Sequence, residues 1–208
     1  MVRKQIQAVS CFTLVDFKRI MKMAIQSNIH LYCNSLAQGK TLLYPTDTIW
    51  GLGCDATNQE AVDAIFKLKN RPKNKPLIAL VSDLDMLSKY VTKLPKNIES
   101  LLDTNIPTTL IYPKGKDLAK GVLSENGSVA IRIPKPCFAL DLITAFGKPI
   151  VSTSANISGE PIPTLQHEID VKILEQVDEI VPLKSENKTH IPSRILLLMP
   201  DGTVKKIR

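Results

Sequence analysis

The sequence has few residues of the kinds that build metal centres and disulfide frameworks. Its 208 residues include four cysteines and three histidines, and no two cysteines form a C-x-x-C pair. A tetrahedral zinc site needs closely spaced Cys or His ligands, so we predict no metal site made by the protein. We interpret Cys11, Cys33, Cys54 and Cys137 as reduced thiols in a reducing compartment.

Long apolar runs and aromatic side chains are also scarce. No apolar run approaches the roughly 20 residues of a membrane span, and the first 17 residues lack the small-residue cleavage site of a secretory signal. We therefore expect a cytoplasmic protein without membrane contact. Aromatic residues make up 5% of the chain and do not interleave with its basic segment, so stacking platforms for single-stranded nucleic acid are not evident.

Predicted strands and helices alternate along the chain. We expect strands at residues 41–44, 77–81, 109–112, 129–133, 149–152, 195–199 and 204–207. We expect helices at residues 28–38, 83–89, 96–102, 138–146 and 165–177, and one that starts at the capping box Thr57–Glu60 and ends at Pro72. Residues 46–56 are predicted to form a glycine-containing loop.

This alternation, with a hairpin signal at Pro200-Asp201-Gly202, predicts a single-domain α/β fold. The expected architecture is a twisted mixed sheet with helices packed on it. Residues 1–27 look less orderly, and we predict that they are an N-terminal extension that the core, residues 28–208, does not need. The net charge of +7 suits an anionic ligand such as ATP or RNA.

Two glycine motifs fail the tests of the sites that they suggest. Gly39-Lys40-Thr41 lacks the earlier glycine of a phosphate-binding loop and precedes a strand instead of following one. Gly51–Ala56 fits the loose dinucleotide fingerprint, but no acidic residue follows about 20 positions later. We interpret these glycines as permitting a tight turn or a close approach of the backbone to a ligand.

Three polar segments are the candidates for a functional site. Tyr44–Gly53 places hydroxyls and a carboxylate directly after a buried strand, where ligands of open α/β sheets gather. Phe66–Pro76 holds five basic residues, no acid and two stiffening prolines, which suits polyphosphate. Ile150–Gly159 runs from a buried strand into small hydroxyl residues and an asparagine. Each segment alone also fits a structural interpretation as a rigid turn, a solvated basic loop or a locally capped strand end.

Together the three segments resemble the YrdC family, which includes threonylcarbamoyl-AMP synthases. The family signature is K-x-R followed far downstream by S-x-N, here Lys69-Asn70-Arg71 and Ser154-Ala155-Asn156. The resemblance runs from about Leu31 to Arg208, which makes residues 28–208 the expected YrdC-like catalytic domain. It implies that L-threonine, bicarbonate and ATP with Mg²⁺ give threonylcarbamoyl-AMP and pyrophosphate, for the t6A modification of tRNA.

The resemblance also implies roles for individual residues. Residues expected to bind the nucleotide are Lys69, Arg71, Lys75, Ser154, Asn156 and Arg208, with Lys69 and Arg71 also catalytic. Residues expected to bind threonine are Thr48, Ser128, Arg132, Ser152 and Ser193, with Arg132 pairing with the carboxylate. Since the K-x-R segment looks like a polar loop, replacing either of its basic residues by alanine is predicted to cut turnover without unfolding the protein.

The sequence departs from the family pattern at three positions, and two other functions stay open. Leu80 stands where some members carry a histidine, Trp50 where a tyrosine is common, and Arg194 where a small residue follows Ser193. The alternatives are an RNA-binding module of the same fold without synthase activity, and a related enzyme with different chemistry. The implied partner is a downstream transferase acting on tRNA, and the basic loop leaves weak RNA binding by the chain itself open.

Overall fold

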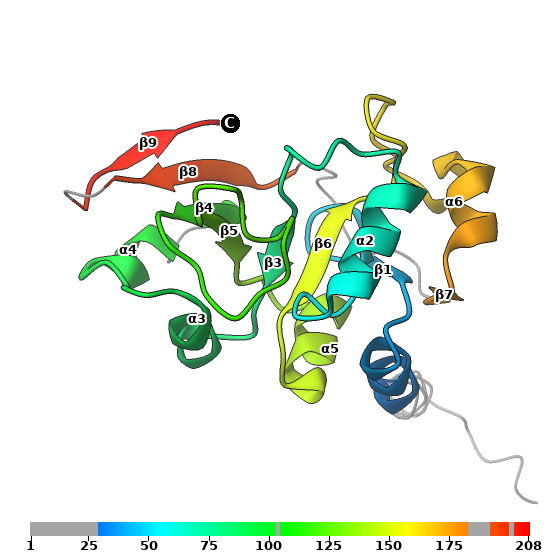
Figure 1. Ribbon diagram of the computed structural model, residues 1–208, viewed down its shortest axis with the longest axis horizontal. Helices are drawn as coiled ribbons and strands as arrows, with labels where there is room; N and C mark the ends of the chain where they lie inside the picture. Colours follow the sequence, from blue (N-terminus) through cyan, green and yellow to red (C-terminus); the bar gives the residue numbers. More distant parts are fainter. Residues whose placement is uncertain (1–28, 103–104, 183–191, 200–201) are drawn as a thin grey trace, which may run out of the picture.

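The computed structural model describes residues 29–102, 105–182, 192–199 and 202–208, so the predicted N-terminal extension at residues 1–27 lies outside the described residues. In the described part, nine strands form one mixed sheet in the order β7-β1-β2-β6-β3-β5-β4-β8-β9. In Figure 1, β7 and α6 lie at one end of this sheet and the β8–β9 hairpin at the other. The predicted α/β class with a mixed sheet is confirmed.

The bounds of the elements agree with most of the predicted ones to within two residues. The strands are β1 (Leu42–Pro45), β2 (Trp50–Gly53), β3 (Ile78–Leu80), β4 (Thr108–Tyr112), β5 (Val129–Arg132), β6 (Ile150–Ser154), β7 (Glu179–Ile180), β8 (Arg194–Leu198) and β9 (Val204–Lys206). The helices are α2 (Gln59–Leu68), α3 (Leu84–Tyr90), α4 (Ile98–Leu102), α5 (Phe138–Phe146), α6 (Val171–Gln176) and the 3₁₀ turn η1 (Gln166–Glu168). Residues 29–37 form a further helix. No helix in the described ranges is long and apolar enough to cross a membrane.

The central strands have one packed face and one partly open face. Ala130 on β5 pairs with Ile78 on β3 and with Ile111 on β4, and all three side chains are only partly buried. Their neighbours on the other face, such as Ile131 and Leu110, belong to a core shared with buried residues of α2 and α5. Because side chains alternate across a strand, the three partly buried residues form an apolar floor on the open face.

The prediction that residues 46–56 form a loop is wrong for four of them. β2 pairs antiparallel with β1 on one side and with β6 on the other. Gly53 permits a close approach of two strands, since a Cβ on this residue would lie 1.9 Å from the carbonyl oxygen of Val151 on β6. The strand was missed because the sequence WGLG lacks the β-branched residues that mark strands.

Three smaller predictions also change. The cap of α2 is Asn58, whose side-chain oxygen accepts from the amide of Ala61 at 3.1 Å, while the hydroxyl of Thr57 donates to Asp55. The helix predicted at residues 165–177 is split, because Asp170 caps a new helix by accepting from the amide of Lys172 at 2.7 Å. β7 was not predicted, since two residues carry no periodicity.

Candidate functional site

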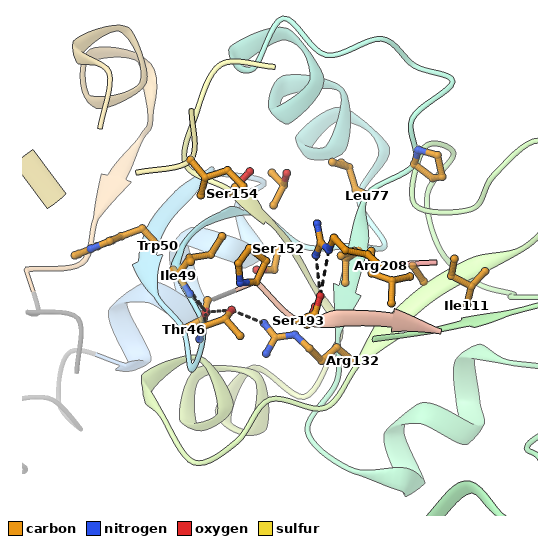
Figure 2. A pocket seen from close by; sticks show the side chains of 18 of the residues that line it. Thr46, Ile49, Trp50, Leu77, Ile111, Arg132, Ser152, Ser154, Ser193 and Arg208 are labelled. Carbon is orange, nitrogen blue, oxygen red and sulfur yellow. Dashed lines mark hydrogen bonds between the residues drawn. The ribbon is translucent and has the colours of Figure 1, made fainter. Parts of the chain in front are cut away.

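A cavity of about 290 Å³ lies over the open face of the sheet (Figure 2). Its volume is at the lower end of the range for small-molecule sites, which is roughly 300–1,000 Å³. The apolar floor described above contributes Ile78, Ile111 and Ala130. The polar side chains lining it are Thr46, Thr48, Arg71, Arg132, Ser152, Thr153, Ser154, Ser193 and Arg208.

Three arginines give the cavity its charge. Arg132 comes from the end of β5 and extends toward the Thr46 turn, and Arg208 lies beside Ser193 (Figure 2). Two nitrogens of Arg208 donate to the carbonyl oxygen of Ser193, Nη2 at 2.9 Å and Nε at 3.3 Å. Arg71 is held by its own loop, where Nε donates to the carbonyl of Lys75 at 2.8 Å. No acidic side chain of the described residues lines the cavity, so the arginines make it a site for an anion.

The turn between β1 and β2 fixes the hydroxyls on one wall. The Thr46 hydroxyl donates to the carbonyl of Ile49 at 2.8 Å and accepts from the amide of Thr48 at 3.1 Å. The Thr46 and Thr48 hydroxyl oxygens are 3.0 Å apart, and both residues are buried. This local network holds the Thr48 hydroxyl 3.5 Å from Nη2 of Arg132. The wall therefore offers a hydroxyl and a guanidinium edge at the same place.

Arg132 already has a partner within the chain. Its Nη1 donates to Oδ1 of Asp47, and the side chains of both residues are only 5% exposed. From the sequence, Arg132 was predicted to pair with the carboxylate of threonine, and no separate role was predicted for Asp47. The structure shows a buried ion pair that ties the β1–β2 turn to the end of β5.

The two signature motifs are in direct contact, although 85 residues separate Lys69 from Ser154. Nζ of Lys69 donates to the carbonyl oxygens of Ser154 and Asn156, the latter at 2.6 Å, and lies 3.5 Å from Oδ1 of Asn156. In return, the carbonyl of Lys69 accepts from the amide of Ser158 at 2.8 Å. An ammonium group has three donors, and here they face three oxygens of the chain itself.

The sequence suggested that Lys69 belongs to an exposed polar loop, but the structure shows that its side chain is buried. It is 1% exposed and does not line the cavity, whereas Arg71, two residues later, does. The interaction of Lys69 with the S-x-N segment fixes the end of β6, which presents Ser152 and Ser154 to the cavity. In the structure the lysine supports the wall of the site, and the arginine faces its interior.

The cavity brings together seven of the eleven residues expected at the site. These are Thr48, Arg71, Arg132, Ser152, Ser154, Ser193 and Arg208. Lys69, Lys75, Asn156 and Ser128 do not line it. Lys75 is exposed at the surface, and Asn156 is buried behind the wall, where Nδ2 donates to the carbonyl of Glu160 at 2.6 Å.

Ser128, which the family resemblance placed among the threonine ligands, does not line the cavity. Ser128 precedes β5 whereas Arg132 ends it, and four residues of strand span about 13 Å. Its hydroxyl lies 2.7 Å from that of Ser124 in a separate groove that also includes Lys73 and Asp63. Although Ser128 and Arg132 are close in the sequence, they lie at opposite ends of β5.

The three departures from the family pattern have different surroundings. Trp50 lines the cavity and is 1% exposed, Leu80 is fully buried in β3, and Nε of Arg194 donates to the hydroxyl of Thr108 at 2.8 Å. The apolar floor of the cavity was not predicted from the sequence. The alternation of side chains along the predicted strands indicated which residues share a face. It could not show that residues of different strands lie side by side, because the order of the strands in the sheet was not known.

A left-handed residue ends α2 and separates the two basic residues of the K-x-R motif. Asn70 has φ +48°, and the amide of Arg71 donates back to the carbonyl of Phe66 at 2.9 Å while that of Asn70 donates to Lys67 at 3.1 Å. This is the Schellman arrangement, which most often uses glycine or asparagine. The turn directs Lys69 toward the S-x-N segment and leaves Arg71 on the side of the cavity.

Replacing Asn70 should therefore change the free energy of unfolding by an amount that depends on how well the new residue adopts the left-handed backbone conformation. We expect Asn70→Ala to lower the free energy of unfolding by about 1 kcal/mol, because a Cβ without a compensating polar group disfavours the left-handed region. Asn70→Gly is the matched control and should change it little. Urea denaturation of the two variants and the wild type measures the difference, and equal midpoints would contradict the account.

The buried position of Lys69 also predicts an unusual titration. Burial, and then the nearby Arg71 guanidinium, lower the pKa of Lys69 to about 7, although the three accepting oxygens favour the ammonium form. In the unfolded chain the lysine pKa returns to about 10.4. Between these values the unfolded protein binds more protons, so the free energy of unfolding should rise with pH through this window.

Titration of ¹³C-lysine-labelled protein by NMR measures this pKa directly. One lysine resonance should move well below pH 9, and it should be missing from the spectrum of Lys69→Met. If all lysines titrated together near pH 10, burial would not lower the pKa of Lys69, and the predicted rise of stability with pH would be absent.

Comparisons with known proteins identify the family of this chain. Residues 34–208 match the model of the Sua5/YciO/YrdC family, described as telomere recombination. The chain is 37% identical over 142 residues to the threonylcarbamoyl-AMP synthase of Pseudoalteromonas translucida, covering 66% of this chain and 76% of that protein. It is 33% identical over 177 residues to the synthase of Vibrio cholerae, covering 83% of this chain and 94% of that one.

Solved structures show the same fold. Pyrococcus abyssi Sua5 in complex with L-threonine has a TM-score of 0.79 at 29% identity, covering 86% of this chain and 53% of that chain. This chain thus spans about half the length of that protein. Escherichia coli YciO has a TM-score of 0.72 at 26% identity, covering 88% of this chain and 89% of that one. From the match to the family model over most of its length, we conclude that the chain belongs to the Sua5/YciO/YrdC family, as the K-x-R and S-x-N motifs predicted.

Proposed function

We propose that this protein is a threonylcarbamoyl-AMP synthase, which makes threonylcarbamoyl-adenylate and pyrophosphate from L-threonine, bicarbonate and ATP. One observation supports the proposal: three fixed arginines and the Thr48 hydroxyl surround a cavity that no acidic side chain of the described residues lines, in a chain similar to proteins named as that synthase. A site for both a carboxylate and a polyphosphate needs this excess of positive charge.

In this reaction the protein mainly positions the reacting groups and neutralises charge. Bicarbonate takes up a proton and releases water to give carbon dioxide, which the amine of threonine adds with loss of a proton, and a carbamate results. A carbamate oxygen then forms a bond to the α-phosphorus of ATP as the bond to the bridging oxygen breaks, and pyrophosphate leaves. No covalent intermediate with the protein is required, so oriented cations on a rigid scaffold account for catalysis.

The lining residues divide between the two substrates by their place in the cavity. We assign the threonine carboxylate to the Nη2 edge of Arg132 and the Thr48 hydroxyl, which lie 3.5 Å apart. Ser152 and Ser193 supply small polar groups for the remainder of the amino acid. Arg71 and Arg208 are the cations for the phosphates, and Ser154 contacts the nucleotide near them.

We expect Mg²⁺ to enter with ATP. Among the described residues no three His, Cys, Asp or Glu side chains come together to hold a metal ion. The phosphate oxygens are the hard ligands that this cation prefers, and the bound ion would neutralise part of their charge. The arginines of the cavity supply the protein's share of that neutralisation.

The product implies a partner. A mixed anhydride of a carbamate and AMP is an activated acyl donor, so we expect a transferase that loads the threonylcarbamoyl group onto adenosine in tRNA. We therefore expect the protein to act in tRNA modification in the cytoplasm. The cavity supports a small-molecule site more than an extended RNA surface, because its floor is apolar and its charges converge on one hollow.

Pyrophosphate release from ATP and Mg²⁺ tests the function, with threonine and bicarbonate each present or withheld. We expect release only when both are present, together with ¹⁴C-bicarbonate incorporated into an adenylate. Release without threonine would indicate different chemistry on this fold. If no mixture gave release but the chain bound tRNA with a steep dependence on salt, the RNA-binding alternative would replace the synthase.

A further inference from the structure

Asp47 makes contacts that join three parts of the fold behind the cavity. Its Oδ1 accepts from Nη1 of Arg132, and its Oδ2 accepts from the backbone amide of Lys135 at 3.0 Å. Asp47 belongs to the β1–β2 turn, Arg132 ends β5, and Lys135 lies in the segment leading to α5. Both carboxylate oxygens are thus used within the chain, and the side chain is 5% exposed.

Asp47 does not line the cavity, whereas its neighbour Thr48 and its partner Arg132 do. The guanidinium is a flat fork whose nitrogens point in fixed directions. Asp47 takes Nη1, and Nη2 is left on the side of the Thr48 hydroxyl at 3.5 Å. The carboxylate therefore holds Arg132 from behind in one rotamer, with its other edge toward the cavity.

We propose that Asp47 is a positioning residue that fixes Arg132 for recognition of the substrate's carboxylate. The inference rests on the proposed function, which assigns that carboxylate to Arg132 and Thr48. A long arginine side chain loses rotamer entropy when it binds a ligand, and the ion pair removes that freedom before the substrate arrives. The amide of Lys135 keeps the Asp47 carboxylate in place, so it does not swing into the cavity and repel an anionic ligand.

The chain contains a matched control for this carboxylate. Asp55 also has a side chain that is 5% exposed, and it pairs with Lys148 at 3.1 Å and accepts from the backbone amide of Thr57 at 2.8 Å. It does not line the cavity, and the hydrogen-bond partners of its side chain among the described residues, Thr57 and Lys148, do not line it either. Asp47 and Asp55 therefore share burial, an ion pair and a backbone donor, but only Asp47 contacts a cavity arginine.

The test compares Asp47→Asn with Asp55→Asn in pyrophosphate release, varying threonine at saturating ATP and then ATP at saturating threonine. We expect Asp47→Asn to raise the KM for threonine about 10- to 100-fold, the loss of one charged hydrogen bond, with little change in the KM for ATP. Asp55→Asn should lower the melting temperature but leave both KM values near those of the wild type. In Asp47→Asn/Arg132→Gln the threonine KM should be no higher than in Arg132→Gln alone, because Asp47 acts through Arg132.

The possible results distinguish a failure of the positioning role of Asp47 from a failure of the proposed synthase function. A wild type without threonine-dependent release overturns both. An active wild type with an unchanged or lower threonine KM in Asp47→Asn overturns only the positioning role, and a lower value would mean that Asp47 competes with the substrate for Arg132. If Asp47→Asn does not fold, Asp47→Glu decides: it keeps the charge but displaces the guanidinium, so a raised threonine KM supports the role and an unchanged one overturns it.

Discussion

Replacing Lys69 with methionine is expected to lower turnover by about 100-fold or more and to lower the melting temperature as well. Methionine fills a similar volume but donates no hydrogen bond, so the oxygens around Nζ, including the carbonyls of Ser154 and Asn156, lose their partner. Each buried polar group left without a partner costs about 1–3 kcal/mol. The end of β6 would then shift, and a misplacement of about 1 Å at a reacting group costs on the order of 100-fold in rate.

Lys75→Met is the control, since Lys75 is a lysine of the same basic segment, Phe66–Pro76, but is exposed and lies outside the cavity. Pyrophosphate release and thermal melts of the two variants separate the roles. If Lys69→Met melted like the wild type and lost only affinity for ATP, Lys69 would be a phosphate ligand and not a support of the wall. A matching loss in Lys75→Met would show that net charge, and not the buried contacts, sets turnover.

Gly53→Ala is expected to prevent β2 from pairing with β6 and to destabilise the protein by about 3 kcal/mol or more. The added Cβ would lie 1.9 Å from the carbonyl oxygen of Val151, which is backbone of the neighbouring strand, and 3.0 Å from the hydroxyl of Tyr44. A flexible side chain would move aside, but here two central strands would have to separate. Since β6 carries Ser152 and Ser154, the cavity would be lost with the pairing.

Gly147→Ala provides the comparison for Gly53. Gly147 has φ +73° at the C-cap of α5, and a Cβ there would meet nothing within 4 Å. Replacing it with alanine should therefore lower the free energy of unfolding only by the cost of the left-handed backbone conformation, about 1 kcal/mol. Urea unfolding and the yield of folded protein measure both. Equal losses in the two variants would mean that the β2–β6 contact relaxes easily.

Much of the fold followed from local patterns in the sequence. Helix α5 (Phe138–Phe146) was predicted with its observed bounds, since an apolar periodic segment is closed there by Gly147. The β8–β9 hairpin followed from the turn residues at 200–202. Strand β2 was missed because the property that matters at Gly53, a backbone contact with Val151, is absent from the local sequence.

The chemistry of the site was predictable, but the division of tasks within it was not. K-x-R and S-x-N gave the family, and seven of the expected residues do line one cavity. The motifs did not show that Lys69 faces the backbone of Asn156 and not the cavity, nor that Arg132 is paired with Asp47. Nor did they show that Ser128 lies outside the cavity, at the other end of β5 from Arg132.

The sequence by itself determined the α/β class, the family and the residue types at the site, because periodicity, turn residues and short motifs are local properties of the chain. Only the tertiary structure decided which of these residues meet. The order of strands in the sheet places Ile78, Ile111 and Ala130 side by side as a floor, and the ends of β5 and β6 beside the β1–β2 turn. Contacts between residues about 85 positions apart, such as Arg132 with Asp47, depend on that order, which no local pattern encodes.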